Sequence, residues 1–248
     1  MEILSSYDPI TLDRMDSIRL MNRVDTKYVA SLDMLETVLE RARSDYYVLE
    51  TSGGRVAAYD SMYFDTASLD MYMTHHSGRL VRRKVRTRTY VASGDTYLEV
   101  KRKNNHKRTK KKRIQIPSDG FGHPFDSPEA ASFVLERSGY EALSLEPALT
   151  TTFDRITLVS KSMTERLTID MHLRFGNLRT GLSADMGRLV VIEIKQDSLA
   201  SSPMADILQE LRIHPMGMSK YCIGTAMTSP GLKQNRFKSR IHKIQKYI

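Results

Sequence analysis

Residues 80–90, LVRRKVRTRTY, combine strand-forming residues with a run of positive charges. Successive side chains of a β-strand point to opposite faces of the sheet. This stretch therefore places Arg82, Lys84, Arg86 and Arg88 together on one face. Whether that face lies in solvent or around an anion decides the fold and function that the sequence favours.

The same alternation recurs along most of the chain and predicts further strands. The predicted strands are Ala57–Phe64, Leu80–Val91, Thr96–Lys103, Lys110–Pro117, Leu149–Leu158, Glu165–Leu173 and Arg188–Lys195. Four helices are predicted between them, starting near Thr11, Ser31, Ser127 and Ser202. We expect an α+β fold in which antiparallel strands form a barrel with flanking helices.

Charged side chains share one face on six of the predicted strands. Besides residues 82–88, the faces hold Glu99, Lys101 and Lys103; Lys111 and Arg113; Phe153 and Arg155; Arg166 and Asp170; Glu193 and Lys195. A single polar face is readily explained by solvent, but six mostly cationic faces favour a shared interior. Confined Lys and Arg repel one another unless an anion lies between them, and phosphate binds both.

The composition excludes several other classes of protein. The chain has 248 residues, 40% of them hydrophobic, and we expect one domain over residues 1–248. Its net charge of +9 attracts polyanions, and basic clusters lie at residues 79–88, 101–113 and 233–246. The single cysteine, Cys222, excludes an internal disulfide. No membrane-spanning apolar run and no signal-peptide pattern are present, so we expect a cytoplasmic protein.

Glu193 is a carboxylate among these cations and is the candidate metal ligand, with Glu99 as a second candidate. Mg²⁺ and Mn²⁺ prefer oxygen ligands and are often held by one or two carboxylates plus substrate phosphates. For both residues the alternative is a salt bridge with a neighbouring Lys. The adjacent His75 and His76 would point apart on a strand, which disfavours a shared metal ion.

Nine motifs, in order along the chain, resemble those of VTC domains, the catalytic domains of the vacuolar transporter chaperone polyphosphate polymerase and its bacterial relatives. These domains belong to the triphosphate tunnel metalloenzyme superfamily. The motifs are Arg23–Tyr28, Tyr63–Thr66 with Leu69, Tyr72 and His75 after it, Arg82–Tyr90, Leu98–Lys101, Lys111–Arg113, Phe153–Arg155, Arg166–Asp170, Ile192–Lys195 and Ser219–Tyr221. The resemblance covers about residues 14–226.

The resemblance implies an antiparallel eight-stranded β-tunnel with basic walls. It also implies a polymerase that transfers the γ-phosphate of ATP to a growing polyphosphate chain, with Mn²⁺ or Mg²⁺ at Glu193 and no specific nucleic acid. The implied phosphate ligands are Lys27, Arg86, Arg88, Lys101, Lys111, Arg155, Arg166, Ser219 and Lys220, to which the strand faces add Arg113 and Lys195.

The expected catalytic roles divide these cations into two groups. The transferred phosphate would be neutralised by Arg86, Arg88, Arg155 and Arg166. Lys27 and Lys220 would orient the acceptor and the donor.

Two positions depart from the family pattern. Gly217 stands where a Lys is common, two residues before Ser219. Phe153 stands where a Tyr is often found, two residues before Arg155. We expect these changes to affect turnover and substrate affinity more than the fold.

Two other functions fit parts of the sequence. A tunnel triphosphatase would pass the phosphate to water, but relatives of that kind open with Glu-x-Glu-x-Lys. Here the equivalent triplet is Arg23, Asp25 and Lys27, with one carboxylate. A non-catalytic polyanion-binding module would gain nothing from Glu193 and Glu99.

The C-terminal stretch, about residues 231–248, is predicted as a basic helix with Phe237, Ile241, Ile244 and Ile248 on one face. Such a helix would pack on the domain or close a tunnel mouth. The alternative is peripheral contact with an anionic membrane or a membrane partner.

Overall fold

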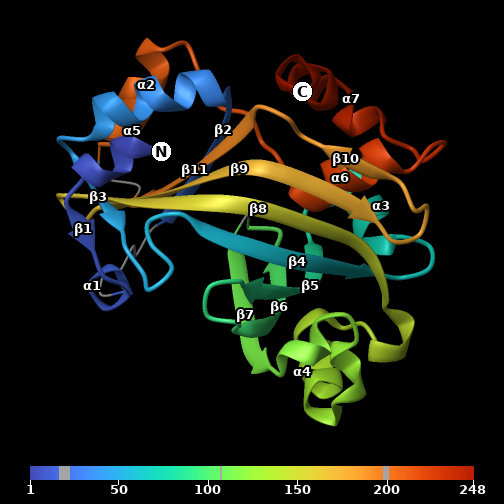
Figure 1. The fold of residues 1–248 in the computed structure, drawn as a ribbon. Coiled ribbons are helices and arrows are strands. Elements are labelled where there is room, and N and C mark those ends of the chain that lie inside the picture. The colour runs from blue at the N-terminus through green and yellow to red at the C-terminus, as the bar shows by residue number, and fades with distance from the viewer. Residues whose placement is uncertain (17–22, 107, 198–200) are drawn as a thin grey trace.

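The computed structural model describes residues 1–16, 23–106, 108–197 and 201–248. A large curved sheet runs through the molecule, and helices pack around it (Figure 1). The strands are β1 (Pro9–Ile10), β2 (Arg23–Ser31), β3 (Tyr46–Leu49), β4 (Ala57–Asp65), β5 (Arg82–Tyr90), β6 (Thr96–Lys103), β7 (Thr109–Ile116), β8 (Glu146–Ser160), β9 (Glu165–Asn177), β10 (Ser183–Asp185) and β11 (Leu189–Asp197). The α-helices are α1 (Leu12–Asp16), α2 (Leu32–Ala42), α3 (Asp70–His76), α4 (Pro128–Ser138), α5 (Pro203–Glu210), α6 (Lys220–Thr228) and α7 (Asn235–Ile244).

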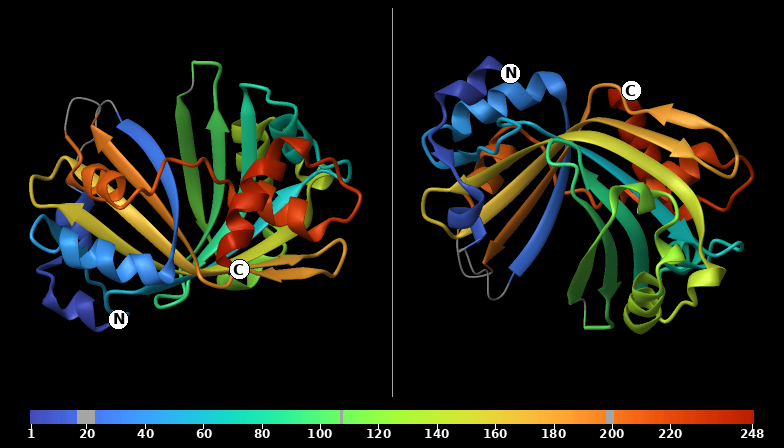
Figure 2. Two further views of the ribbon diagram at one scale, coloured as in Figure 1. Left: turned by 90° about the horizontal axis from the view of Figure 1, so that it is seen from above. Right: turned by 60° about the horizontal axis from the view of Figure 1, so that its bottom comes forward.

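Eight strands follow one another across the sheet in the order β2-β11-β9-β8-β4-β5-β6-β7. The short strands β10, β3 and β1 extend this path at its sides, and the β1–β3 pair is parallel. Among the described residues no ladder joins β2 to β7, so hydrogen bonds do not close the sheet. Figure 2 shows the strands coming together in one region and spreading apart from it. The predicted α+β fold, an antiparallel eight-stranded tunnel with flanking helices, is confirmed with this difference in closure.

The strand register brings the charged faces next to one another. Residues directly opposite in neighbouring strands include Lys27–Glu193, Asp25–Lys195, Arg166–Lys195, Arg155–Asp170, Arg86–Glu99 and Lys101–Lys111. Directly opposite residues on one face interact: opposite charges stabilise the pair, whereas like charges, as in Arg166–Lys195 and Lys101–Lys111, repel each other. The charged residues that alternate along each strand therefore also lie beside one another across the sheet, on one shared face.

Apolar clusters on both faces of the sheet hold the helices in place. On the outer face, α2 and α5 pack against residues such as Ile156, Ile169 and Ile192. On the inner face, α6 covers one end of β8 and β9. A Cβ on Gly224 in α6 would lie 2.7 Å from side-chain atoms of Leu149 and Phe175. The absence of a side chain therefore lets α6 lie directly on the sheet, with its first turn directed at the charged region.

The sequence pattern predicts most of the longer elements within a few residues but misses β2, α3, α6 and the short strands β1, β3 and β10. The prediction that treats His75 and His76 as extended is wrong, because both lie in α3. This helix begins where the buried Asp65 accepts hydrogen bonds from the backbone N–H groups of Met71 (2.9 Å) and Tyr72 (3.0 Å). A carboxylate in that position replaces the missing acceptors of the first helical turn.

The predicted C-terminal helix forms as α7 over part of the expected range, and Ile248, expected on its apolar face, lies beyond it and is 53% exposed. In α7 the side chains of Phe237, Ile241 and Ile244 are buried against the rest of the chain. The structure thus favours packing on the domain, and contact with a membrane or a membrane partner stays a prediction. No helix in the described part of the chain is both long and apolar enough to cross a membrane.

Candidate active site

The inner face of the sheet surrounds a cavity of about 460 Å³. Ten cationic and four acidic side chains line it, an excess of six positive charges. The cationic residues are Lys27, Lys84, Arg86, Arg88, Lys101, Lys111, Arg155, Arg166, Lys195 and Lys220. The acidic residues are Asp25, Glu99, Asp170 and Glu193, and Ser219 also lines the cavity. The structure thus brings together all the predicted phosphate and metal ligands except Arg113.

Glu99 on β6 holds two of these cations. Its Oε2 atom accepts hydrogen bonds from Arg86 Nε (2.8 Å) and Nη2 (2.6 Å), and its Oε1 atom accepts one from Lys111 Nζ (2.9 Å). Burial alone would raise the pKa of Glu99, but Arg86, Arg88 and Lys111 hold it well below its usual range. Glu99 is therefore ionised and its two oxygens are engaged, which favours the salt-bridge interpretation over metal binding.

Asp170 on β9 makes the same kind of bridge. Its two oxygens accept hydrogen bonds from Arg155 Nε (2.6 Å) and Nη2 (2.8 Å), and Oδ2 also pairs with Lys220. Burial opposes ionisation, yet Arg155 and Lys220 hold the pKa of Asp170 below its usual range. For Lys220, burial and the repulsion from Arg155 outweigh the attraction of Asp170 and lower its pKa to about 8.

Glu193 on β11 forms the third bridge, to Lys27 and, at 3.6 Å, to Lys195. Burial would raise the pKa of Glu193, but the two lysines lower it below its usual range. Burial also lowers the pKa of Lys195, to about 8. The three carboxylates Glu99, Asp170 and Glu193 therefore each lie between two cations.

The described residues contain no cluster of three or more His, Cys, Asp and Glu side chains that could hold a metal ion. A divalent cation would have to be bound by one or two cavity carboxylates, Glu193 and Asp25, together with phosphate oxygens. Oxygen donors of this kind suit Mg²⁺ and Mn²⁺. The residues fit such an ion if it displaces a lysine from Glu193.

Two stacked aromatic rings support a second group of cations. The rings of Tyr59 and Phe153 are parallel within 5°, with centroids 5.3 Å apart. The guanidinium carbons of Arg88 and Arg155 lie 5.5 and 5.2 Å from the centroid of the Phe153 ring, and Lys220 Nζ lies 4.3 Å from it. Attraction between cations and ring faces offsets part of their mutual repulsion. Phe153 therefore has a clear role although it lacks the hydroxyl that the family often has there.

The N-terminus of α6 brings Ser219 and Lys220 to the cavity. Ser219 Oγ accepts hydrogen bonds from the Cys222 backbone N–H (3.2 Å) and from Lys84 Nζ (2.8 Å). Lys84 is a cavity residue that the sequence analysis did not select, although the alternation in residues 80–90 places it on the right face. Gly217 lies just before this turn and lines an adjoining cavity, where the family's Lys would add a further cation.

Tyr63 on β4 is a second residue that the sequence analysis missed. Its hydroxyl accepts a hydrogen bond from Arg86 Nη1 (3.0 Å), and it lines the cavity. Burial would raise the pKa of Tyr63, but Arg86, Lys84 and Arg88 lower it to about 8. The ring also stacks on Tyr221 in α6, with centroids 5.2 Å apart.

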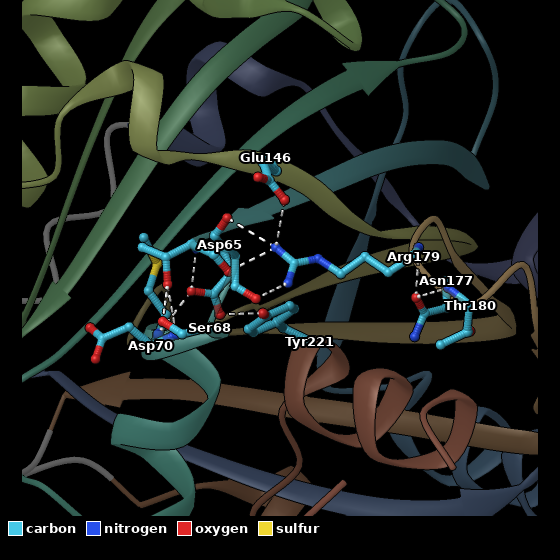
Figure 3. A network of polar contacts seen from close by, with 11 residues as sticks. Asp65, Ser68, Asp70, Glu146, Asn177, Arg179, Thr180 and Tyr221 are labelled. Atoms are coloured by element: carbon cyan, nitrogen blue, oxygen red, sulfur yellow. Dashed lines mark hydrogen bonds and ion pairs between the residues drawn. The ribbon is translucent and has the colours of Figure 1, made fainter. Parts of the chain in front are cut away.

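A buried polar network fixes α6 relative to β4 (Figure 3). The Tyr221 hydroxyl donates a hydrogen bond to Asp65, the residue that starts α3. From the loop after β9, Arg179 donates to the backbone carbonyls of Asp65 (3.3 Å) and Thr66 (2.8 Å). The resemblance selects the Tyr63–Thr66 and Ser219–Tyr221 motifs separately, and here they are in contact. The contact between Tyr221 and Asp65 fixes the position of the neighbouring Lys220, and Asp65 itself is not a phosphate ligand.

Arg113 on β7 lies apart from the cavity. Its guanidinium carbon is 4.4 Å from the centroid of the Tyr97 ring, and Nη1 donates to the Tyr90 hydroxyl (3.1 Å). Because Arg113 is exposed and already packed on an aromatic ring, the geometry does not support its selection as a cavity ligand. Its expected role in phosphate binding stays a prediction.

The sequence matches the model of the VTC domain over residues 22–229, most of the chain and all of the strands around the cavity. The chain belongs to the VTC domain family. No curated protein matches this chain. The resemblance that the nine motifs indicate is thereby confirmed.

Two solved structures share the fold of this chain. A proposed adenylate cyclase from Bacillus halodurans is 12% identical and superposes with a TM-score of 0.53, covering 80% of this chain and 94% of that chain. A proposed adenylyl cyclase from Hippeastrum, described as having a dominant triphosphatase activity, is 15% identical with a TM-score of 0.51. It covers 86% of this chain and 99% of that chain. At these identities the likeness shows the fold alone.

Proposed function

We propose that this VTC domain is a polyphosphate polymerase, which transfers the γ-phosphate of ATP to a growing polyphosphate chain. The observation that supports this most is the cavity with ten cations, in which Glu99, Asp170 and Glu193 each bridge two of them. Such a site is built to hold many phosphate groups at once, and it is preorganised before the substrate arrives.

Phosphoryl transfer depends mainly on positioning and on neutralising charge. Arg86 is held by three hydrogen bonds and Arg155 by two, so their remaining N–H groups have fixed directions. These arginines would neutralise the transferred phosphate, and Lys27 and Lys220 would orient the acceptor and donor. The terminal phosphate oxygen of the chain attacks the γ-phosphorus of ATP, the bond to the β-phosphate oxygen breaks, and ADP leaves.

Metal dependence is a property of the tunnel metalloenzymes, and the ion here would be Mn²⁺ or Mg²⁺. Glu193, with Asp25, would hold it, and the ion would supply positive charge to the phosphate oxygens. Binding of the ion would require Lys27 to turn from Glu193 towards the substrate.

A tunnel triphosphatase is the second candidate, because the Hippeastrum protein with this fold is described as having that activity. Hydrolysis benefits from a base that activates water. In this cavity Glu99, Asp170 and Glu193 have pKa values below their usual range, which makes them weak bases. Because these carboxylates are paired with cations, the cavity favours an acceptor that is already an anion, such as the terminal phosphate of a chain. Such an acceptor needs no base to remove a proton before it attacks.

Incubation with ATP and Mn²⁺, followed by gel electrophoresis of the product, separates the candidate functions. Long-chain polyphosphate is expected. Free phosphate without polymer would support the triphosphatase instead, and unchanged ATP would support a polyanion-binding module. The same assay without Mn²⁺ and with Mg²⁺ tests the metal requirement.

Two substitutions test the site itself. Arg86→Ala should lower the rate of synthesis by about 100-fold or more, since a preorganised donor to the transferred phosphate is lost. Glu193→Gln should abolish the metal-dependent part of the activity. Arg174→Gln is the matched control, because Arg174 is exposed and pairs with Asp185 away from the cavity. Wild-type synthesis in either cavity variant would overturn the site assignment, provided that circular dichroism shows all variants to be folded.

A further inference from the structure

A second cavity of about 450 Å³ adjoins the first at the end covered by α7. The two cavities share lining residues, among them Lys27, Lys84, Lys101 and Ser219, so they form one continuous space. Beyond the shared part, the second cavity is lined by His75, Arg82, Arg83, Lys103, Arg236 and Arg240. Arg236 and Arg240 lie on α7, outside the residues 22–229 that match the family. Figure 1 shows α7 beside α6 and α3.

The cations of this second cavity differ from those of the first in their partners. Within the described residues, Arg82, Arg236 and Arg240 form no ion pair with a carboxylate. Arg83, next to them, has a buried Nε atom without a hydrogen-bond partner. In the first cavity, by contrast, Glu99, Asp170 and Glu193 each form ion pairs with two cations. The second cavity is thus left with positive charge that an outside anion would balance.

Packing holds these side chains in place despite their repulsion. Phe237 and Ile241, on either side of Arg240, are buried and anchor α7. A Cβ on Gly78 would lie 2.6 Å from Arg236 Nη1, so the guanidinium lies directly against the backbone after α3. His75 faces the same space, and burial together with Lys84 and Arg82 lowers its pKa to about 3, so it is neutral. The cavity therefore presents arginines and no competing acid of its own beyond the shared Asp25 and Glu193.

We propose that Arg82, Arg236 and Arg240 form a second phosphate-binding subsite, which holds the part of a polyphosphate chain that extends beyond the first cavity. The identification of the anion as polyphosphate rests on the proposed function, whereas the presence of an anion subsite rests on the arginines alone. Arginine binds phosphate oxygens with pairs of N–H groups, and three such residues match a chain with a charge on every unit.

The shape of the site favours a narrow, flexible polyanion. The arginines line a cavity between α7, α3 and β5, so a ligand that contacts all three of them has to enter that cavity. Continuity with the first cavity means that one chain can occupy both. A single inorganic phosphate shares the chemistry but would gain nothing from that continuity, so chain length distinguishes the two ligands.

The test compares binding of tripolyphosphate and of polyphosphate several tens of units long, measured by calorimetric titration at one fixed ionic strength. The variant is the full chain with Arg236→Gln and Arg240→Gln. The matched control carries Lys238→Gln and Lys243→Gln, the same change of charge at exposed positions of α7 that line neither cavity. Thermal unfolding verifies that α7 remains packed in both.

We expect the arginine variant to bind the long chain at least about tenfold more weakly and to bind tripolyphosphate within about twofold of the wild type. The lysine control should bind both ligands like the wild type. Equal long-chain affinity in the arginine variant and the wild type, or an equal loss in the lysine control, would overturn the subsite. If the wild type binds long chains with this pattern but makes no polymer from ATP, the proposed function fails while the subsite stands.

Discussion

Removal of the Asp170 carboxylate should destabilise the empty protein and tighten its binding of phosphate. The side chains of Asp170, Arg155 and Lys220 are 5%, 15% and 13% exposed. Asp170→Asn keeps the shape but leaves two buried cations without their counter-ion, which costs about 3–5 kcal/mol. For a chain of 248 residues each lost kcal/mol lowers Tm by roughly 2–4 °C, so we expect a decrease of roughly 6–20 °C.

Phosphate affinity should change in the opposite direction. Two unit charges about 6 Å apart interact by about 3 kcal/mol at an effective dielectric constant of 20, and the repulsion between Asp170 and an anion in the cavity would be of this order. Screening by salt reduces this figure. We therefore expect Asp170→Asn to bind tripolyphosphate at least about tenfold more tightly than the wild type, so that saturating ligand restores much of the lost Tm.

Thermal unfolding with and without tripolyphosphate, together with calorimetric titration, measures both effects. The control is Glu210→Gln, which removes a carboxylate that pairs with Arg41 at the surface, where the two side chains are 68% and 45% exposed. An exposed pair contributes little, so the Tm of this control should stay within about 2 °C of the wild type. If Asp170→Asn melts with the wild type, or binds tripolyphosphate more weakly, Asp170 is not the counter-ion of these two cations and the reasoning is refuted.

Two further predictions concern the same cations. Because the pKa of Lys220 is about 8, against an ordinary 10.5, affinity for long-chain polyphosphate should fall as pH rises from 7 to 9. The free energy of unfolding of the empty protein should rise as the pH increases from about 8 to about 10.5. Over this range Lys220 has lost its proton in the folded protein but keeps it in the unfolded chain. Lys220→Arg, which stays charged, should make both pH profiles shallower but not flat, because Lys195 and Tyr63 also have pKa values of about 8. Profiles identical to those of the wild type would contradict the assignment. Phe153→Leu removes the ring that faces Arg88, Arg155 and Lys220, and should lower stability by about 1–2 kcal/mol in denaturant unfolding and weaken tripolyphosphate binding several-fold.

The period-two alternation predicts the cavity well because it is a local property of each strand. It places Arg86, Glu99, Arg155 and Glu193 on the correct faces, and the curvature of the sheet is enough to bring them together. It fails at Arg113, which continues the pattern of β7 but packs on Tyr97 beyond the cavity. The pattern gives the face of a residue but not its height along the tunnel.

Other parts of the site depend on contacts between distant segments. Lys84 meets Ser219 across 135 positions, and Tyr221 meets Asp65 across 156. No local pattern marks α6 as a helix that enters the sheet, because its fit depends on Gly224 meeting Leu149 and Phe175. For the same reason the sequence predicts a basic C-terminal helix but not that Arg236 and Arg240 face a cavity.

The pairing of carboxylates with cations also explains how a site for a polyanion folds before its ligand is present. Unpaired, the buried arginines and lysines would oppose one another strongly in a space of about 460 Å³. Glu99, Asp170 and Glu193 each neutralise part of that charge and hold the cations in fixed directions. If the proposed function holds, a phosphate chain would take the place of these carboxylates as partner of the cations, and small side-chain movements would be enough for it to bind. The four acidic side chains leave an excess of six positive charges in the cavity, and this excess would attract phosphate groups.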